Sequence, residues 1–311
     1  MVQKGIAERE EKILHQAYHD TLTNLPNRLL ATQEIEKLIK LRSTTETCIA
    51  LISLNINRFK QINSTFGYQT GDSLLTAFAS RIQSLNKGSN FCARLGADEF
   101  LILMEGEEVE GLSSLIQSTV TSLSDSYCIE GFDVTVSLRA GVAIFPLHGD
   151  LSGKLMRRMA IALSEAKQKK KEIQYYEQGS DAKHLSRIKM INDLKLAITN
   201  NHLVMHYQPK VDLHQRKVTQ VEALIRWFHK EQGFISPEEF IRLAEQAGLM
   251  PALTKWVLKT VVSELSIWLK SGISVAVAVN LSAYDLAHDD LPDFINQLLY
   301  EYDVPTTHLI L

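Results

Sequence analysis

The sequence predicts an α/β protein of two domains, and three observations support this fold class. The chain has 311 residues, which is enough for about two ordinary domains. Short apolar segments alternate with amphipathic segments of helical length, as in proteins that layer helices on a largely buried sheet. A stretch around Gly179, rich in turn and capping residues, interrupts this pattern. We therefore expect a lead-in helix over residues 1–19, a first domain over 20–178 and a second domain over 179–311.

Composition narrows the class of function. The formal net charge is −3 and 45% of the residues are hydrophobic, so the chain lacks the basic balance of a general nucleic-acid binder. Cys48, Cys92 and Cys128 form no metal-ligand pattern and are expected to be buried free thiols. No apolar run approaches the roughly 20 residues of a membrane span, and no secretory signal is visible. The sequence predicts a cytoplasmic protein with no nucleic-acid partner, and tethering to the inner membrane through upstream segments is compatible with it.

The first half consists of alternating helical and strand patterns. An amphipathic stretch predicts a helix over 5–19, and the turn 20–28 is full of capping residues that open a second helix, ending near residue 41. An apolar run predicts a strand at 48–54, and a turn at 67–72 precedes an amphipathic helix over 73–85. The remaining expected elements are strands at 91–95, 100–104 and 134–144 and a helix at 155–169.

Three motifs in this half occur in the order and spacing of a known family. They are DTLTNLPNR at 20–28, NRFKQINSTFGYQTGDSLL at 57–75 and RLGADEF at 94–100. With them, residues 15–178 resemble a GGDEF domain, the fold of diguanylate cyclases. The resemblance implies a site that joins two GTP molecules into cyclic di-GMP with divalent metal, because the metal neutralises the triphosphate.

The chain departs from this family where the chemistry is most demanding. The resemblance implies metal-binding acids at two positions that here hold Asn55 and Asn57, and neutral amides carry no charge to hold Mg²⁺. Ala97 replaces the second glycine of the turn, and its methyl group opposes positive φ and close approach to phosphate. Lys87 and Asn90 stand in the place of the family's inhibitory RxxD motif, which binds product. We therefore expect the first domain to make no cyclic di-GMP.

Other positions keep residues that the resemblance connects with nucleotide. An amide and a carboxylate would read guanine, a pair of acids follows Ala97, and two lysines would lie near the phosphates. The lysines are equally compatible with a solvated basic helix end. The amide and the carboxylate are Asn63 and Asp72, the two acids are Asp98 and Glu99, and the two lysines are Lys167 and Lys171. Two roles stay open for the domain, a regulatory domain that binds GTP and a structural or dimerising module, and we expect a homodimer or a partner protein.

The second half alternates strands and helices in the manner of the first half of a TIM-like (β/α) barrel. Strands are expected at 203–207, 218–222, 274–279 and from 307, and helices at 182–199, 237–246, 253–269 and 290–302. The first of these helices has an apolar stripe made of Leu185, Ile188, Ile191, Leu194, Leu196 and Ile198. In such barrels the chemistry gathers at the C-terminal ends of the strands.

Four polar residues are expected at those strand ends: Gln208, Glu222, Arg226 and Asn280. An acid and an arginine four residues apart suit a metal ion and a phosphate, because carboxylate oxygens bind hard cations and guanidinium matches phosphate. A solvated Glu–Arg pair is the alternative for Glu222 and Arg226, and a strand-end cap is the alternative for Asn280.

Four motifs in order give this half its own resemblance. They are YQPKVDL at 207–213, EALIRWFH at 222–229, PEEFIRLAEQAGLM at 237–250 and VNLSAYDL at 279–286, and they resemble an EAL domain, the fold of cyclic di-GMP phosphodiesterases. The resemblance implies that Glu222 and Asn280 are catalytic metal ligands for two Mg²⁺ or Mn²⁺ ions. It also implies that Gln208, Leu224 and Arg226 contact cyclic di-GMP, which the family hydrolyses to the linear dinucleotide.

The resemblance implies further ligands beyond the strand that begins at Thr307. We therefore expect the chain to be a fragment of a longer protein or a truncated gene product, and residues 1–311 alone not to hydrolyse cyclic di-GMP. For the parent protein we expect a metal-dependent cyclic di-GMP phosphodiesterase with an inactive, regulatory first domain. The alternative is a non-enzymatic cyclic di-GMP receptor. A third possibility, a diguanylate cyclase, is disfavoured by Asn55 and Ala97.

Overall fold

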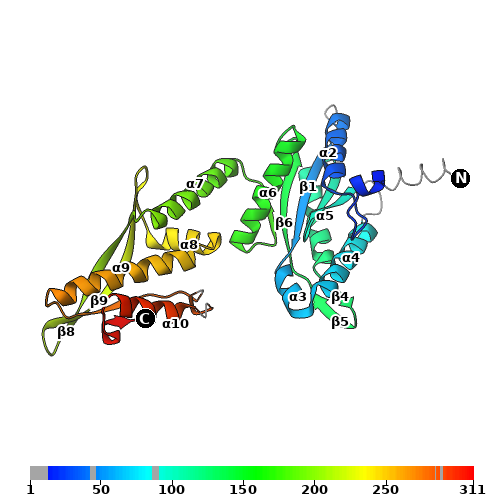
Figure 1. Cartoon of the computed structure of the whole chain (residues 1–311). Helices are drawn as coiled ribbons and strands as arrows, with labels where there is room; N and C mark the ends of the chain where they lie inside the picture. The colour runs from blue at the N-terminus through cyan, green and yellow to red at the C-terminus, as the bar shows by residue number, and fades with distance from the viewer. Residues whose placement is uncertain (1–12, 43–46, 86–90, 284, 288–289) are drawn as a thin grey trace. The chain divides into compact units, whose positions relative to one another are not determined.

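The computed structural model describes residues 13–42, 47–85, 91–283, 285–287 and 290–311. Its contacts divide the chain into two compact units, Met1–His184 and Leu185–Leu311 (Figure 1). Residues 13–18 are helical, and the earlier part of the expected helix over 5–19 lies outside the described residues, as do Lys87 and Asn90.

A five-stranded sheet in the order β2-β3-β1-β6-β7 forms the centre of the first unit. The central strand β1 pairs antiparallel with β3 and β6, whereas β7 runs parallel to β6. The strands of this sheet are β1 (Cys48–Ile56), β2 (Phe91–Gly96), β3 (Glu99–Gly106), β6 (Leu138–Phe145) and β7 (Ile173–Tyr175). A separate hairpin joins β4 (Ser126–Ile129) to β5 (Phe132–Thr135).

Helices cover both faces of this sheet (Figure 1). Ile52 and Leu54 of β1 belong to the core cluster under α4 and α5, whereas Ile49 and Leu51 belong to the cluster under α2 and α6. Because β1 is buried on both faces, its sequence is a continuous apolar run rather than an alternating one. The helices are α2 (Arg28–Arg42), α3 (Phe59–Phe66), α4 (Tyr68–Leu85), α5 (Val109–Leu123) and α6 (Ser152–Lys169).

Two expectations for this unit were wrong. The expected turn over 67–72 is mostly helix, because only Gly67 has positive φ (93°) and α4 begins at Tyr68. The expected strand over 134–144 is two strands, since β5 pairs with β4 and β6 pairs with β1. Sequence reasoning did not predict α3, α5, β4 or β7.

The second unit contains an open sheet in the order β10-β9-β11-β12, with β8 paired to β9. β8, β9 and β10 are antiparallel neighbours, whereas β9, β11 and β12 are parallel. The strands are β8 (Leu203–Asp212), β9 (Lys217–His229), β10 (Gly233–Ile235), β11 (Ala276–Val279) and β12 (Leu309–Ile310). The α/β class is confirmed, and the sheet is open rather than closed into a barrel. The two strands expected in succession at its start, β8 and β9, form a hairpin with no helix between them.

The helices of this unit pack against the sheet through two apolar clusters. They are α7 (Ser180–Thr199), α8 (Pro237–Ala247), α9 (Met250–Lys270) and α10 (Leu291–Glu301), with short 3₁₀ turns at Asp285–Ala287 and Thr306–His308. Ser236 caps α8 by accepting a hydrogen bond from the Glu239 backbone N–H, and Gly248 ends it with φ of 68°.

Two predictions about burial need correction. Leu194 and Ile198 of α7 are buried, but Leu185, Ile188 and Leu196 are 62%, 45% and 56% exposed. The buried stripe instead includes Met190 and Ala197, which the apolar pattern did not select. The three cysteines are free thiols, but none is fully buried: Cys48 and Cys92 are half-buried, and Cys128 is exposed because it lies on the outward side of the β4–β5 hairpin. Among the described residues, no helix is long and apolar enough to cross a membrane.

Candidate functional site

Strand β9 separates its side chains into two sets. Val221 and Ala223 are buried in the cluster beneath α9 and α10. Successive side chains of a strand point to opposite faces, so Glu222, Leu224 and Arg226 share the other face of the sheet. These three residues are half-buried. The period of two thus places the predicted acid, leucine and arginine side by side.

Gln208 lies directly opposite Glu222 in the β8–β9 register. The expectation that these two residues end their strands was wrong. β8 continues to Asp212, and β9 continues to His229 because β8 and β10 pair with its second half. Gln208, Glu222 and Arg226 therefore stand on the face of a long hairpin, and only Asn280 follows the end of its strand directly.

Asn280 and Glu222 are in contact. In the parallel pairing of β9 and β11, Glu222 lies opposite Ala278, two residues before Asn280. The Asn280 Nδ2 donates to Glu222 Oε1 at 2.9 Å, and Lys210 Nζ lies 3.5 Å from Glu222 Oε2. The hydrogen bond from Asn280 and the charge of Lys210 lower the pKa of Glu222 below its usual value. Sequence reasoning missed Lys210, although its even position on β8 puts it on the same face as Gln208.

The donor set suits a hard divalent cation. A carboxylate and an amide carbonyl are oxygen ligands of the kind that Mg²⁺ and Mn²⁺ prefer. Asn280 would bind through Oδ1 after a half-turn of its amide, because its Nδ2 now faces Glu222. Within the described part of the chain, no group of three or more His, Cys, Asp or Glu side chains could hold a metal ion. Glu222 and Asn280 therefore supply part of a site.

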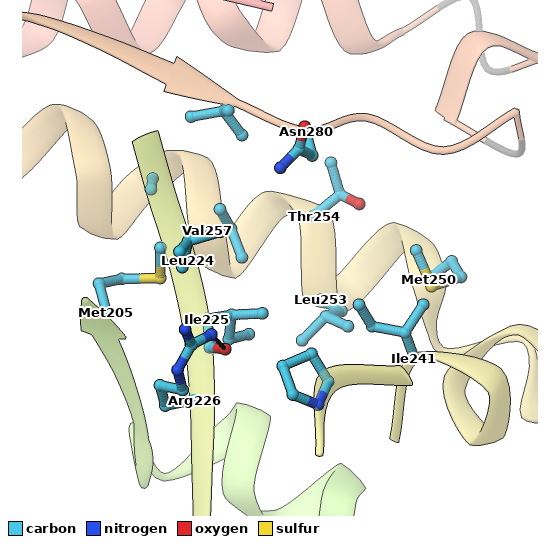
Figure 2. A pocket seen from close by; sticks show the side chains of 13 residues that line it. Met205, Leu224, Ile225, Arg226, Ile241, Met250, Leu253, Thr254, Val257 and Asn280 are labelled. Carbon is cyan, nitrogen blue, oxygen red and sulfur yellow. Dashed lines mark hydrogen bonds between the residues drawn. The ribbon is translucent and has the colours of Figure 1, made fainter. Parts of the chain in front are cut away.

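A cavity of about 190 Å³ lies beside β9, where the strand faces helices α8 and α9. Leu224, Arg226 and Asn280 line it, together with apolar side chains of α8 and α9 such as Ile241 and Val257 (Figure 2). The Arg226 guanidinium donates from Nη1 to the neighbouring Ile225 carbonyl at 2.9 Å. Two of the predicted substrate contacts, Leu224 and Arg226, thus border one mostly apolar hollow with few polar groups, which is typical of small-molecule sites, whereas Gln208 and Glu222 do not line it.

The predicted residues of the first unit gather where β1 ends. Asn55 lies opposite Glu99 on β3 and opposite Arg139 on β6. The Asn57 Nδ2 donates to Ser137 Oγ at 3.2 Å, and the Asp98 carbonyl accepts from the Ile56 N–H. The amides at 55 and 57 and the acids at 98 and 99 thus meet at one end of the strands, the edge of the sheet where β1 finishes.

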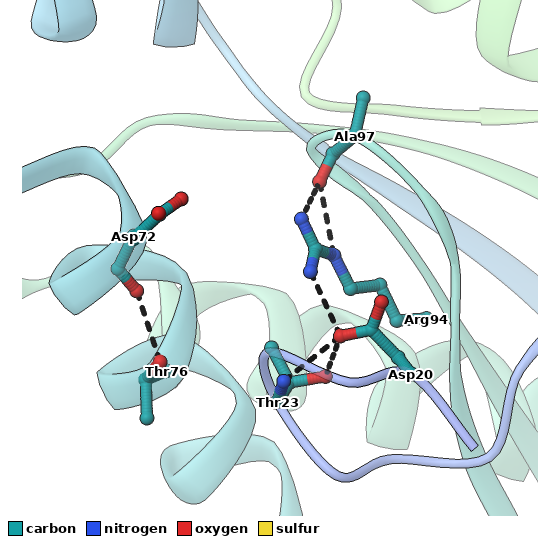
Figure 3. A network of polar contacts seen from close by, with 6 residues as sticks. All are labelled: Asp20, Thr23, Asp72, Thr76, Arg94 and Ala97. Carbon is teal, nitrogen blue, oxygen red and sulfur yellow. Dashed lines mark hydrogen bonds and ion pairs between the residues drawn. The ribbon is translucent and has the colours of Figure 1, made fainter. Parts of the chain in front are cut away.

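The turn that carries Ala97 is held by an arginine. Ala97 has φ of 42°, the left-handed region that a Cβ disfavours. Arg94 donates to the Ala97 carbonyl from Nε and Nη2, at 3.0 and 2.7 Å (Figure 3). Its Nη1 lies 2.8 Å from Asp20 Oδ1, and the same oxygen accepts from the backbone and hydroxyl of Thr23. Asp20 thereby links the segment before α2 to the turn.

The remaining predicted residues occupy helices or their ends. Asn63 is on α3, and its buried Oδ1 has no hydrogen-bond partner among the described residues. Asp72 is exposed on α4, where its backbone carbonyl accepts from Thr76 (Figure 3). Lys167 is exposed near the end of α6, and Lys171 is exposed in the short link to β7. No contact recorded for the described residues joins these four to one another.

Replacing Asp20 by asparagine is expected to destabilise the first unit by about 1–3 kcal/mol at neutral pH, because it breaks a largely buried ion pair. Burial alone would raise the pKa of Asp20, but hydrogen bonds from Arg94 and Thr23 outweigh it and hold that pKa below the usual value. The extra stability is therefore present above the unfolded pKa of about 3.9 and is lost as pH falls through the folded value. Urea unfolding followed by circular dichroism should show the gap between wild type and Asp20→Asn closing below about pH 4.

The exposed Asp133 on β5 offers a matched control. Asp133→Asn removes the same charge and should leave the urea midpoint unchanged. An Asp20→Asn variant as stable as wild type at pH 7 would show that the Arg94–Asp20 pair contributes nothing.

Comparison with known proteins gives two family matches. The model described as "Diguanylate cyclase, GGDEF domain" matches residues 17–172, and the "EAL domain" model matches residues 191–311. The bifunctional diguanylate cyclase/cyclic di-GMP phosphodiesterase MucR of Pseudomonas aeruginosa is 33% identical over 309 residues, which are 99% of this chain and 45% of MucR. The cyclic di-GMP phosphodiesterase PdeR of Escherichia coli is 31% identical over 293 residues, 94% of this chain and 44% of PdeR. The chain thus spans less than half the length of these relatives.

Among solved structures, the coiled coil and GGDEF domain of DgcB from Caulobacter crescentus, in complex with c-di-GMP, resembles the first half of the chain. The TM-score is 0.50 with 24% sequence identity, and the match covers 55% of this chain and 92% of that one. At this identity the likeness shows the fold of the first unit.

Proposed function

Because the chain belongs to the GGDEF and EAL families and carries one domain of each in tandem, we propose that the natural protein is a metal-dependent cyclic di-GMP phosphodiesterase. Its first domain would be inactive as a cyclase and would regulate the second by binding nucleotide. The observation that carries the proposal is the contact of Glu222 with Asn280, at 2.9 Å, on the face that also presents Leu224 and Arg226. Phosphodiesterases with EAL domains generally depend on divalent metal.

The proposed chemistry divides the work among the residues of this face. Glu222 and Asn280 would hold a divalent metal, Mg²⁺ or Mn²⁺, which when bound activates water and stabilises charge on the scissile phosphate. Arg226 would contact the non-bridging phosphate oxygens, because its planar guanidinium pairs with phosphate through charge-assisted hydrogen bonds. Gln208 would position the dinucleotide from the opposite strand, and Leu224 would give it an apolar surface beside the cavity.

The first domain is a poor fit for cyclase chemistry. Asn55 and Asn57 bring no charge to the edge where metal-bound triphosphate would lie. The methyl group of Ala97 hinders the close approach of phosphate to the turn. We expect residues 1–311 to form no cyclic di-GMP from GTP with Mg²⁺ or Mn²⁺, as followed by chromatography of the nucleotides. Product formation in this assay would overturn the regulatory assignment of the domain.

The test of the main proposal uses the natural protein at its full length. Cyclic di-GMP is incubated with it in Mg²⁺, in Mn²⁺ and in excess chelator, and the linear dinucleotide is separated by chromatography. Hydrolysis that stops with the chelator supports the phosphodiesterase. Binding of cyclic di-GMP without hydrolysis under either metal would replace the enzyme with a receptor, and the absence of both would reject the assignment to this second messenger.

A further inference from the structure

Arg139 stands beside the position from which the first domain lost an acid. In the antiparallel register, Glu99 on β3, Asn55 on β1 and Arg139 on β6 lie in one row across three strands. Directly opposite residues of an antiparallel sheet point to the same face. The guanidinium of Arg139 therefore shares the face of Asn55 and Glu99, at the edge where β1 ends.

The same face is the one covered by α6. Gly141, two residues after Arg139, packs against the backbone of α6 at Met159 and Leu163. Lys167 lies one helical turn beyond Leu163, on the same side of that helix. Lys171 precedes β7, which pairs parallel with the start of β6, so it lies at this sheet edge as well. Positive groups thus come to the edge from β6, from α6 and from the link to β7.

In the row formed by Glu99, Asn55 and Arg139, no acidic side chain forms an ion pair with the Arg139 guanidinium. The Glu99 Oε1 accepts a hydrogen bond from the buried Ser53 hydroxyl at 2.8 Å. The Arg139 Nη1 donates to the Leu138 carbonyl at 3.0 Å, which uses one of the five N–H groups of a guanidinium. Among the ion pairs of the described residues, none involves Arg139. Its remaining donors are therefore available to an anion.

This edge does not fit a divalent metal. Asn55 and Asn57 are neutral, and Glu99 is already engaged by Ser53. Arginine stays protonated at any physiological pH, so the Arg139 charge would repel a cation placed beside Asn55. The same guanidinium is well suited to phosphate, because its fork of N–H groups can bind two oxygens at once.

We propose that the first domain binds the phosphate chain of a nucleoside triphosphate without a divalent metal, and that Arg139 supplies the positive charge in the metal's place. The inference rests on the proposed nucleotide-binding role of this domain and adds the form of the ligand, the metal-free triphosphate. Asn55 and Asn57 complement it, because a neutral amide does not repel phosphate as the carboxylates implied by the resemblance would.

Calorimetric titration of residues 1–311 tests the proposal. GTP should bind in excess chelator, and added Mg²⁺ should not tighten this binding, because the edge does not accommodate the metal. Arg139→Gln should raise the Kd for GTP about ten- to hundredfold, as expected for loss of a charge-assisted phosphate contact. Arg139→Lys should recover part of the loss, since it restores the charge but not the bidentate geometry. Arg216→Gln in the β8–β9 hairpin is the matched control and should bind like wild type, and circular dichroism confirms that each variant is folded.

Inorganic tripolyphosphate separates this inference from the function on which it rests. If tripolyphosphate binds through Arg139 but GTP does not, the anion site stands and the nucleotide role fails. If GTP binds only with Mg²⁺, or if Arg139→Gln binds as wild type does, the metal-free site is wrong while nucleotide binding survives. If neither compound binds, both the nucleotide role and the inference are overturned.

Discussion

Replacing Glu222 by glutamine is expected to lower hydrolysis of cyclic di-GMP by the natural protein about a hundredfold or more, because the metal would lose a charged ligand. Glutamine keeps the length and one carbonyl oxygen of the side chain, and it can still accept the hydrogen bond from Asn280. The change therefore removes charge with little change of shape. Initial rates at several Mg²⁺ or Mn²⁺ concentrations, measured at full length, would check it.

Glu245→Gln supplies the control, since it removes the same charge from an exposed position on α8. It should leave both kcat and KM unchanged. The loss in Glu222→Gln should appear in kcat and in the metal concentration needed for half-maximal rate, whereas binding of cyclic di-GMP through Arg226 and Leu224 should largely persist. A Glu222→Gln enzyme with wild-type rate at all metal concentrations would exclude this carboxylate as a metal ligand.

Much of the fold followed from local patterns in the sequence. The apolar run that starts at Cys48 was predicted as a strand, and β1 is indeed buried on both faces. Helices with a clear apolar period, such as α6 and α9, were found within a few residues of their true ends. These predictions succeeded because the apolar pattern of each strand or helix follows from which of its own faces are buried.

The failures share a different physical origin. The apolar run over 134–144 gives no sign that β5 pairs with β4 while β6 joins the main sheet. Strand β9 was expected to end at Glu222, but the hairpin with β8 extends it to His229. Pairing partners decide these boundaries, and a single sequence does not contain them.

The candidate site shows the same division. The resemblance named Glu222 and Asn280, and the structure brings them into contact at 2.9 Å. Lys210 and Arg139 were missed because their importance comes from register, which sets Lys210 on the face of Glu222 and Arg139 opposite Asn55. The roles of all these residues in binding and catalysis remain predictions that the variants above address.

Replacing Gly141 by alanine is expected to destabilise the first unit by about 3 kcal/mol or more, since it would overpack a contact between two backbones. A Cβ at this position would lie 2.2 Å from the Leu163 nitrogen and 2.5 Å from the Met159 oxygen, both in the backbone of α6. A side chain could rotate away, but here the whole of α6 must move off β6. That movement would open the core around Leu155 and disturb the edge that carries Arg139.

The chain provides both a control and a selective readout for this variant. Gly153, near the start of α6, has no atom within 4 Å of an added Cβ, so Gly153→Ala should be neutral or stabilising by up to about 1 kcal/mol. The three tryptophans, Trp227, Trp256 and Trp268, all belong to the second unit. Gly141→Ala should therefore lower the urea midpoint seen by circular dichroism while the tryptophan fluorescence transition stays near its wild-type position. A circular dichroism midpoint equal to that of wild type would mean that α6 and β6 are not packed as closely as the structure has them.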